Sequence, residues 1–182
     1  MRAPAALEKF SRSVWTDSPH LKSRSMNKIQ YTAMTDPSHS DTVLAMMHGL
    51  YAEDPSASKP DHGRFPETIR FLLARPEMGR IVLFNDGQSV HGYSILIPFW
   101  SNEYGGVVLF VDELYVVAQS RGRGIGRGLF EFIARERPFD AVAVFLEVSP
   151  TNQRAQKLYQ SLGFLKRPHA TLAYRLPART PE

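Results

Sequence analysis

Glycines alternate with other residues over positions 122–128, between a long apolar run and a helical pattern. The four glycines are Gly122, Gly124, Gly126 and Gly128, and arginines stand among them at 121, 123 and 127. Glycine lets the backbone approach a ligand closely, and the N–H groups in the first turn of a helix attract anions. The segment therefore predicts a turn that binds a pyrophosphate. A turn without any ligand is the alternative.

The spacing of these glycines differs from that of common nucleotide-binding motifs. A dinucleotide-binding G-x-G-x-x-G sequence needs glycine at position 127 or 129, where Arg127 and Leu129 stand. No Gly-Lys-Ser/Thr sequence follows, so the segment is not a P-loop. The chain has no cysteine, which excludes disulfides, thiolate metal sites and a cysteine nucleophile. The six histidines are scattered, so no metal site is expected, and His48 or His91 as a catalytic base stays open.

Apolar periodicity divides the rest of the chain into strands and helices. Strands are expected at 29–32, 80–84, 89–98, 107–117, 141–148 and 171–176, with a turn at 85–87. Helices are expected at 42–51 with Asp41 as its cap, between Pro66 and Pro76, from 125 to 133, and at 153–162. Residues 53–60 are rich in helix breakers and are expected to form a loop. This order predicts one domain of mixed α/β layers.

The formal net charge of +4 is concentrated near the N-terminus. Residues 1–25 hold five basic and two acidic side chains, whereas the remainder holds 17 basic and 16 acidic ones. A body so nearly neutral lacks the basic stripe of a nucleic-acid-binding protein. We expect residues 1–25 to be a disordered leader or a mis-called start before Met26, with an ordered extension as the alternative. Residues 26–178 are expected to form a single domain.

No apolar run approaches the roughly 18–20 residues that cross a bilayer, so no membrane segment is expected. Residues 1–7 lack the apolar core of a secretory signal. Together with the absence of cysteine, these features predict a cytoplasmic protein.

Two motifs resemble those of a known family. Val116, the sequence Arg121-x-x-Gly124-x-Gly126 and the helix after it resemble the acyl-CoA-binding motif of the GNAT superfamily of N-acetyltransferases. The pattern Asn-x-x-Ala-x-x-x-Tyr-x-x-x-Gly-Phe, common in that family, is matched by Asn152, Ala155, Tyr159, Gly163 and Phe164. The resemblance covers 107–176 closely and 26–106 by element order, and it does not include residues 1–25.

The resemblance implies the GNAT fold, an α/β fold whose mixed and mostly antiparallel central sheet is flanked by helices. It also implies acetyl-CoA as acetyl donor, with no metal ion. The N–H groups of 122–127 would bind the pyrophosphate of coenzyme A, and the main chain of 114–116 would bind its pantetheine arm. The residues so assigned to coenzyme A are Leu114, Tyr115, Val116, Arg121, Gly122, Arg123, Gly124, Ile125, Gly126, Arg127, Asn152 and Tyr159.

Transfer of an acetyl group from a thioester to an amine needs a weak acid that protonates the departing thiolate. Tyr159 is the acid that the resemblance implies, because a phenol with a pKa of ~10 is protonated at pH 7. A core tyrosine at helical spacing is the alternative. Asn152 would bind pantetheine or a water molecule, cap the helix that follows it, or do both.

The same reaction needs a group that anchors or deprotonates the amine. Asp112 and Glu113 are adjacent on one expected strand, so their side chains point to opposite faces. Asp112 matches the acidic residue that acts as base or amine anchor in polyamine-type GNAT enzymes, and Glu113 is the second choice. The alternative is that either carboxylate is a structural partner of Arg121 or Arg123.

The acceptor site is expected to be an aromatic and acidic mouth suited to an ammonium group. Its candidate residues are Tyr51, Glu53, Asp54, Phe99, Trp100 and Tyr104. The alternative is a solvated loop with aromatic side chains in the core. The expected acceptor is a primary amine of a small molecule, such as a polyamine, an amino acid or an aminoglycoside-like compound. A peptide acceptor and a non-catalytic acyl-CoA-binding module are the rival functions, and a homodimer is compatible with the family.

Overall fold

The computed structural model describes residues 28–54, 61–168 and 171–174. These residues belong to two units, one that ends at Ser149 and one that begins at Pro150. The expected leader over 1–25 lies outside the described residues. The single domain expected over 26–178 stays a prediction.

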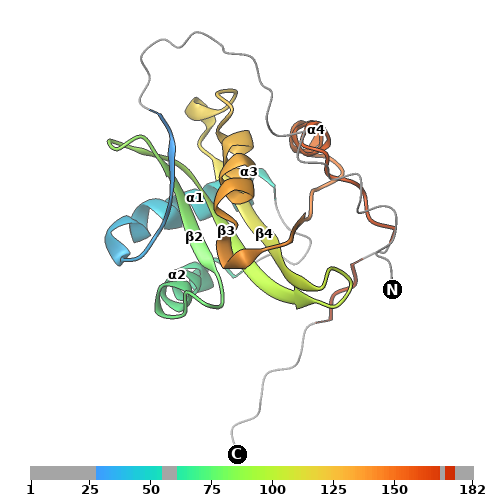
Figure 1. The fold of residues 1–182 in the computed structure, drawn as a ribbon. Helices are drawn as coiled ribbons and strands as arrows, with labels where there is room; N and C mark the ends of the chain where they lie inside the picture. Colours follow the sequence, from blue (N-terminus) through green and yellow to red (C-terminus); the bar gives the residue numbers. More distant parts are fainter. Residues whose placement is uncertain (1–27, 55–60, 169–170, 175–182) are drawn as a thin grey trace, which may run out of the picture. The chain divides into compact units, whose positions relative to one another are not determined.

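The first unit is built on a five-stranded sheet with the strand order β1-β2-β3-β4-β5 (Figure 1). The strands are β1 (Gln30–Ala33), β2 (Arg80–Asn85), β3 (Val90–Ser101), β4 (Gly106–Val116) and β5 (Ala143–Leu146). The first three pairings are antiparallel and the pairing of β4 with β5 is parallel. This confirms the mixed, mostly antiparallel sheet expected from the sequence.

Helices α1 (Ser40–Glu53) and α2 (Phe65–Ala74) pack on one face of the sheet (Figure 1). Apolar residues three or four positions apart give each helix one buried side. The core that they form with β2 and β3 contains Met34, Val43, Met46, Met47, Phe65, Ile69, Leu72, Ile81, Leu83, Tyr93 and Ile95. As expected, Pro66 lies in the first turn of α2.

Helix α3 (Ile125–Glu136) packs on the opposite face of the sheet. The ring of Tyr31 in β1 contacts Phe84 of β2 and Phe132 of α3, and its hydroxyl donates to the Ile125 carbonyl at 2.7 Å. Phe84 follows Leu83, which faces α1 and α2, and successive strand residues point to opposite faces. The glycine-rich segment therefore begins a helix that is fixed to the sheet.

The start and end of α1 differ from the sequence expectation. Asp36 accepts a hydrogen bond from Ser38 N–H at 2.8 Å and caps a short 3-10 turn that runs directly into α1. The helix thus begins at Ser40, and Asp41 lies in its first turn rather than capping it. Glu53 is the last residue of α1 and not part of a loop. Residues 55–60 of the expected loop lie outside the described residues.

The second unit contains α4 (Gln153–Ser161). As expected for a cap, the Asn152 side chain accepts a hydrogen bond from Ala155 N–H at 3.1 Å. The strand expected at 171–176 is wrong for its described part, because residues 171–174 form no strand. Leu172 and Tyr174 are 93% and 84% exposed, so the alternating pattern buries neither side chain. Residues 175–176 lie outside the described residues.

Candidate active site

Strand β4 separates from β5 in the middle of its length. The two strands pair only as far as Val111, opposite Leu146, whereas β4 continues to Val116. The pairing of β4 with β3 skips Asp112, which forms a β-bulge at the same point. Over 112–116, the β5-facing edge of β4 has no strand partner among the described residues. An extended ligand that carries amide groups can add to such an edge.

The glycine-rich turn presents main-chain N–H groups after the end of β4. Gly122 and Gly124 have φ values of 79° and 80°, and a Cβ at either position would meet no atom within 4 Å. The positive φ therefore favours glycine here, while the space above the backbone stays open. Gly124 precedes α3 without a side-chain hydrogen bond to the first turn. An anion fits this turn, so the residues assigned to the pyrophosphate suit that group.

The side chain of Arg121 lies against α1. Its Nε donates to the Val116 carbonyl at 2.7 Å, and its terminal nitrogen lies 2.8 and 2.7 Å from the two carboxylate oxygens of Glu53. Glu53 also accepts from the Tyr115 hydroxyl at 3.2 Å. The hydrogen bond from Arg121 lowers the pKa of Glu53. The carboxylate that Arg121 bonds is therefore Glu53, not Asp112 or Glu113.

Glu113 is a shielded carboxylate with both oxygens occupied. Tyr51 donates to one oxygen at 3.0 Å and Tyr93 to the other at 2.6 Å. Burial raises the pKa of Glu113, although these two hydrogen bonds act in the opposite direction. Burial, followed by the charge of Glu113, raises the pKa of both phenols, so they stay protonated donors. Glu113 thus holds α1 and β3 against β4.

Asp112 differs from Glu113 in burial, because Asp112 is exposed whereas Glu113 is partly buried. Desolvation by surrounding protein raises its pKa, and the nearby charge of Glu147 raises it further. Glu147 directly follows β5, so the two acidic residues stand where β4 and β5 separate. Asp112 is therefore the better placed of the two candidate bases.

The stability of Glu113→Gln relative to the wild type is expected to rise as the pH is raised from the ordinary glutamate pKa through the higher pKa of Glu113 in the folded chain. The folded chain holds the Glu113 proton more tightly than the unfolded chain does, so wild-type stability falls as the pH rises from the unfolded pKa through the folded one. The amide has no charge to desolvate. Thermal unfolding of both proteins at each pH measures the difference. Glu67→Gln, at an exposed first-turn residue of α2, is the matched control, and a pH-independent difference for Glu113→Gln would contradict the argument.

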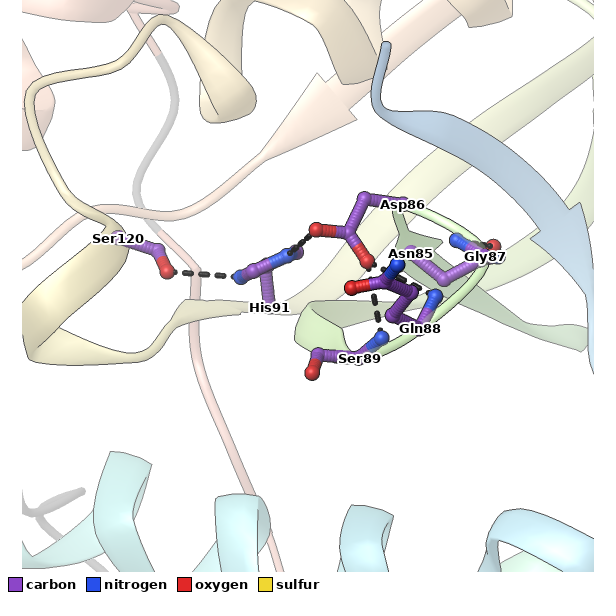
Figure 2. A network of polar contacts seen from close by, with 7 residues as sticks. All are labelled: Asn85, Asp86, Gly87, Gln88, Ser89, His91 and Ser120. Carbon is purple, nitrogen blue, oxygen red and sulfur yellow. Dashed lines mark hydrogen bonds and ion pairs between the residues drawn. The ribbon is translucent and has the colours of Figure 1, made fainter. Parts of the chain in front are cut away.

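The ring Nδ1 atoms of His48 and His91, the two histidines considered as a catalytic base, both contact another side chain. His91 bonds Asp86 through Nε2 and Ser120 through Nδ1, both at 2.9 Å (Figure 2). His48 Nδ1 lies 3.1 Å from His62 Nδ1. Since a base needs an accessible nitrogen lone pair, the His91 hypothesis is wrong.

The residues expected to form the acceptor mouth are divided between two places. Tyr51 and Glu53 lie beside Glu113 and Tyr115, as described above. Trp100 pairs with Val107 at the far end of the β3–β4 hairpin, where it is 67% exposed, and Tyr104 contacts Phe145 there. At about 3.3 Å per strand residue, position 107 lies roughly 26 Å from position 115. Trp100 therefore lies far along β4 from Tyr51 and Glu53, whereas Tyr104 contacts Phe145, two residues before Glu147. Asp54 directly follows α1, and Phe99 contacts Phe145.

The two residues of the second motif lie in the second unit. Tyr159 is in α4, and its ring contacts Phe164 at a centroid distance of 5.7 Å. Asn152 caps this helix, which confirms one of its two expected roles. The acid role of Tyr159 and the pantetheine contact of Asn152 stay predictions.

Some residues of the site carry no local sequence signal. Tyr93 reads as a core strand residue, and its bond to Glu113 follows only from the pairing of β3 with β4. Glu147 stands beside Asp112 only because β5 is parallel to β4. Within the described residues, no three His, Asp or Glu side chains form a possible metal site, and no helix is long and apolar enough to cross a membrane.

Solved structures of acetyltransferases share this fold. A possible acetyltransferase from Clostridium difficile 630 is 20% identical and superposes with a TM-score of 0.71, over 82% of this chain and 99% of that one. The aminoglycoside N-acetyltransferase AAC(6')-Iy in complex with CoA is 16% identical, with a TM-score of 0.67 over 85% and 99% of the two chains. An integron cassette protein from the mobile metagenome of Cole Harbour Salt Marsh is 24% identical, with a TM-score of 0.68 over 82% and 92%.

The sequence model of the acetyltransferase (GNAT) family matches residues 44–164. The matched range includes the strand separation at Asp112, the glycine-rich turn and α4. The chain therefore belongs to the GNAT acetyltransferase family and is by that membership an acetyl-CoA-dependent N-acetyltransferase.

Proposed function

We propose that this acetyltransferase acts on a primary amine of a small molecule, by direct attack and without a covalent enzyme intermediate. One observation carries the proposal: Asp112, an exposed carboxylate, stands where the open edge of β4 begins. Acetyl-CoA along the edge of β4 and the carboxylate of Asp112, which suits an amine, would then lie next to each other. The absence of cysteine agrees with direct transfer, because no thiol is present to form an acyl-enzyme.

The donor would lie along β4 and the glycine-rich turn. The open main chain at Leu114–Val116 suits the amide groups of a pantetheine arm, and the N–H groups of residues 122–127 suit its pyrophosphate. Acetyl-CoA supplies an activated thioester. Arg123 and Arg127 add positive charge to this turn, whereas Arg121 supports it through Glu53 and Val116.

The acceptor would bind at the two carboxylates where the strands separate. Asp112 and Glu147 attract a protonated amine, and a carboxylate with a raised pKa can take up a proton near the working pH. The bound ammonium group first loses one proton to water, and the neutral amine nitrogen then bonds to the thioester carbonyl carbon as the carbon–sulfur bond breaks. Asp112 receives the amine proton, and Tyr159 gives its hydroxyl proton to the leaving sulfur. The similar structure of an aminoglycoside N-acetyltransferase supports a small polyamine-like or aminoglycoside-like acceptor.

Gly124→Ala is expected to weaken acetyl-CoA binding by about tenfold or more. The added Cβ forces an L side chain into a positive φ and occupies the space that a ligand would enter. Gly105→Ala is the matched control, because Gly105 has a φ of 63° and the same open surroundings in the β3–β4 turn. Calorimetry with both variants separates backbone strain from loss of the donor site. If Gly124→Ala and Gly105→Ala bound acetyl-CoA with equal affinity, the glycine-rich turn would not be part of the donor site.

The acceptor is tested with the wild-type protein by measuring the rate at which free thiol is released from acetyl-CoA. A panel of polyamines, amino acids and aminoglycosides is compared with peptides that carry a free N-terminus or a lysine. The proposal expects turnover with small amines to exceed turnover with peptides. Faster acetylation of peptides would favour the protein-acetyltransferase alternative, and acetyl-CoA binding without turnover would favour a binding module.

A further inference from the structure

The β2–β3 hairpin carries a bulge that turns a histidine toward the donor site. Phe84 pairs with Gly92 and Asn85 pairs with Val90, so His91 is the extra residue. A bulge redirects the side chain of the extra residue. Figure 2 shows the His91 ring between the hairpin turn on one side and Ser120 on the other. Ser120 directly precedes Arg121 and the glycine-rich turn.

Asp86 fixes which nitrogen of the His91 ring acts as the donor. One Asp86 oxygen accepts from Gln88 and Ser89 N–H at 3.0 and 2.9 Å, and the other contacts His91 Nε2 at 2.9 Å. The bond from His91, then those from Ser89 and Gln88, hold the pKa of Asp86 well below its usual range. Asp86 is therefore an acceptor only, so Nε2 carries a proton and donates. In the neutral ring, Nδ1 then accepts from the Ser120 hydroxyl at 2.9 Å.

Asp86, His91 and Ser120 do not act as a nucleophilic Ser-His-Asp triad. Ser120 is 1% exposed, so its hydroxyl cannot meet a substrate. The His91 and Asp86 side chains are 13% and 18% exposed. Shielded from water, the three groups form a stable connection between the hairpin and the segment that leads into the glycine-rich turn.

His91 holds both ends of a short turn. Its main-chain carbonyl accepts from Val117 N–H at 3.0 Å, and its ring holds Ser120 at the other end. Within the turn, Ser120 N–H donates to the Val117 carbonyl at 2.9 Å, which closes the 3-10 segment Ala118–Ser120. This turn joins the end of β4 at Val116 to Gly122. It therefore sets the spacing between the two segments that would hold the pantetheine arm and the pyrophosphate.

We propose that His91, held by Asp86, is a positioning residue that fixes the spacing between the pantetheine-binding strand and the pyrophosphate-binding turn. The inference rests on the proposed donor site. A ligand that bridges both segments gains affinity when their spacing is set before binding. A ligand that touches only one segment gains nothing from that spacing.

The test compares whole coenzyme A with its nucleotide half, 3′-phosphoadenosine 5′-diphosphate. In His91→Ala and Ser120→Ala, calorimetry should show coenzyme A binding weakened roughly tenfold and the nucleotide half changed by less than about twofold. Ser120→Ala removes one hydroxyl group only, so it keeps the test valid if His91→Ala folds poorly. His91→Asn should restore much of the affinity, because its amide oxygen can accept from Ser120.

The matched control is His39→Ala, at an exposed histidine before α1. It should bind both ligands as the wild type does. Equal weakening of both ligands, or unchanged affinity for coenzyme A in the His91 and Ser120 variants, would overturn the positioning role. Failure of the wild type to bind coenzyme A would instead overturn the donor site, so the two failures are distinguishable.

Discussion

Asp112→Asn is expected to lower kcat by about 10²- to 10³-fold while the affinity for acetyl-CoA changes little. Asparagine has the same shape but cannot take up the proton of the attacking amine. The raised pKa of Asp112, caused first by desolvation and then by Glu147, makes its carboxylate a stronger base than an ordinary aspartate. Because Asp112 is the bulge residue of β4, the substitution leaves its neighbours' pairing with β3 in place.

The measurement is the rate of thiol release with the best amine of the panel, together with calorimetry for acetyl-CoA. Wild-type kcat/KM should rise with pH through an acid limb that lies above the usual aspartate range, and Asp112→Asn should lose this limb. Asp140→Asn, at an exposed aspartate after α3, is the matched control. If Glu113→Gln lost activity while Asp112→Asn kept it, the roles of the two carboxylates would be reversed.

Local patterns in the sequence are enough to place the donor elements. The glycine-rich turn, the long strand before it and the amphipathic helix after it are all short-range features, and the structure contains each of them. Proline works in the same way, since Pro66 lies in the first turn of α2 and Pro76 follows its end. These residues restrict their own backbone, so their effect is readable without knowing the rest of the fold.

The partners of the site side chains are not readable in this way. Glu53 and Arg121 are 68 residues apart in sequence, Tyr51 and Glu113 are 62 apart, and His91 and Ser120 are 29 apart. Such pairs depend on which strands pair and in which register, and the number of residues between two partners reveals neither. Arg121 shows the consequence: its motif predicts a charge for the pyrophosphate, yet its side chain bonds α1 and β4.

Which of the two carboxylates, Asp112 or Glu113, is shielded from solvent also follows only from the structure. Adjacent strand residues point to opposite faces, but the pattern cannot say which face is shielded. The register places Glu113 opposite Ile95, a core residue, and the bulge removes Asp112 from the ladder. The strand expected over 171–176 is absent from its described residues, 171–174, for a related reason, since an alternating pattern forms a strand only where a neighbouring strand pairs with it.

Tyr159→Phe is expected to lower kcat by about 10²-fold or more. Phenylalanine keeps the ring, and with it the contact with Phe164, but removes the hydroxyl that would protonate the leaving thiolate. The substitution should therefore leave acetyl-CoA affinity close to that of the wild type. Loss of the proton donor acts on the departing sulfur, so the effect belongs in kcat rather than in binding of the amine.

Thiol-release kinetics with saturating acetyl-CoA measure this loss. The alkaline limb of the wild-type pH profile, which reports deprotonation of the acid, should be absent in Tyr159→Phe. Tyr174→Phe is the matched control, because Tyr174 is 84% exposed and belongs to the same unit as Tyr159. Equal loss in both variants would point to a general effect of the substitution. Unchanged turnover in Tyr159→Phe would mean that water protonates the thiolate and that Asp112 alone carries the chemistry.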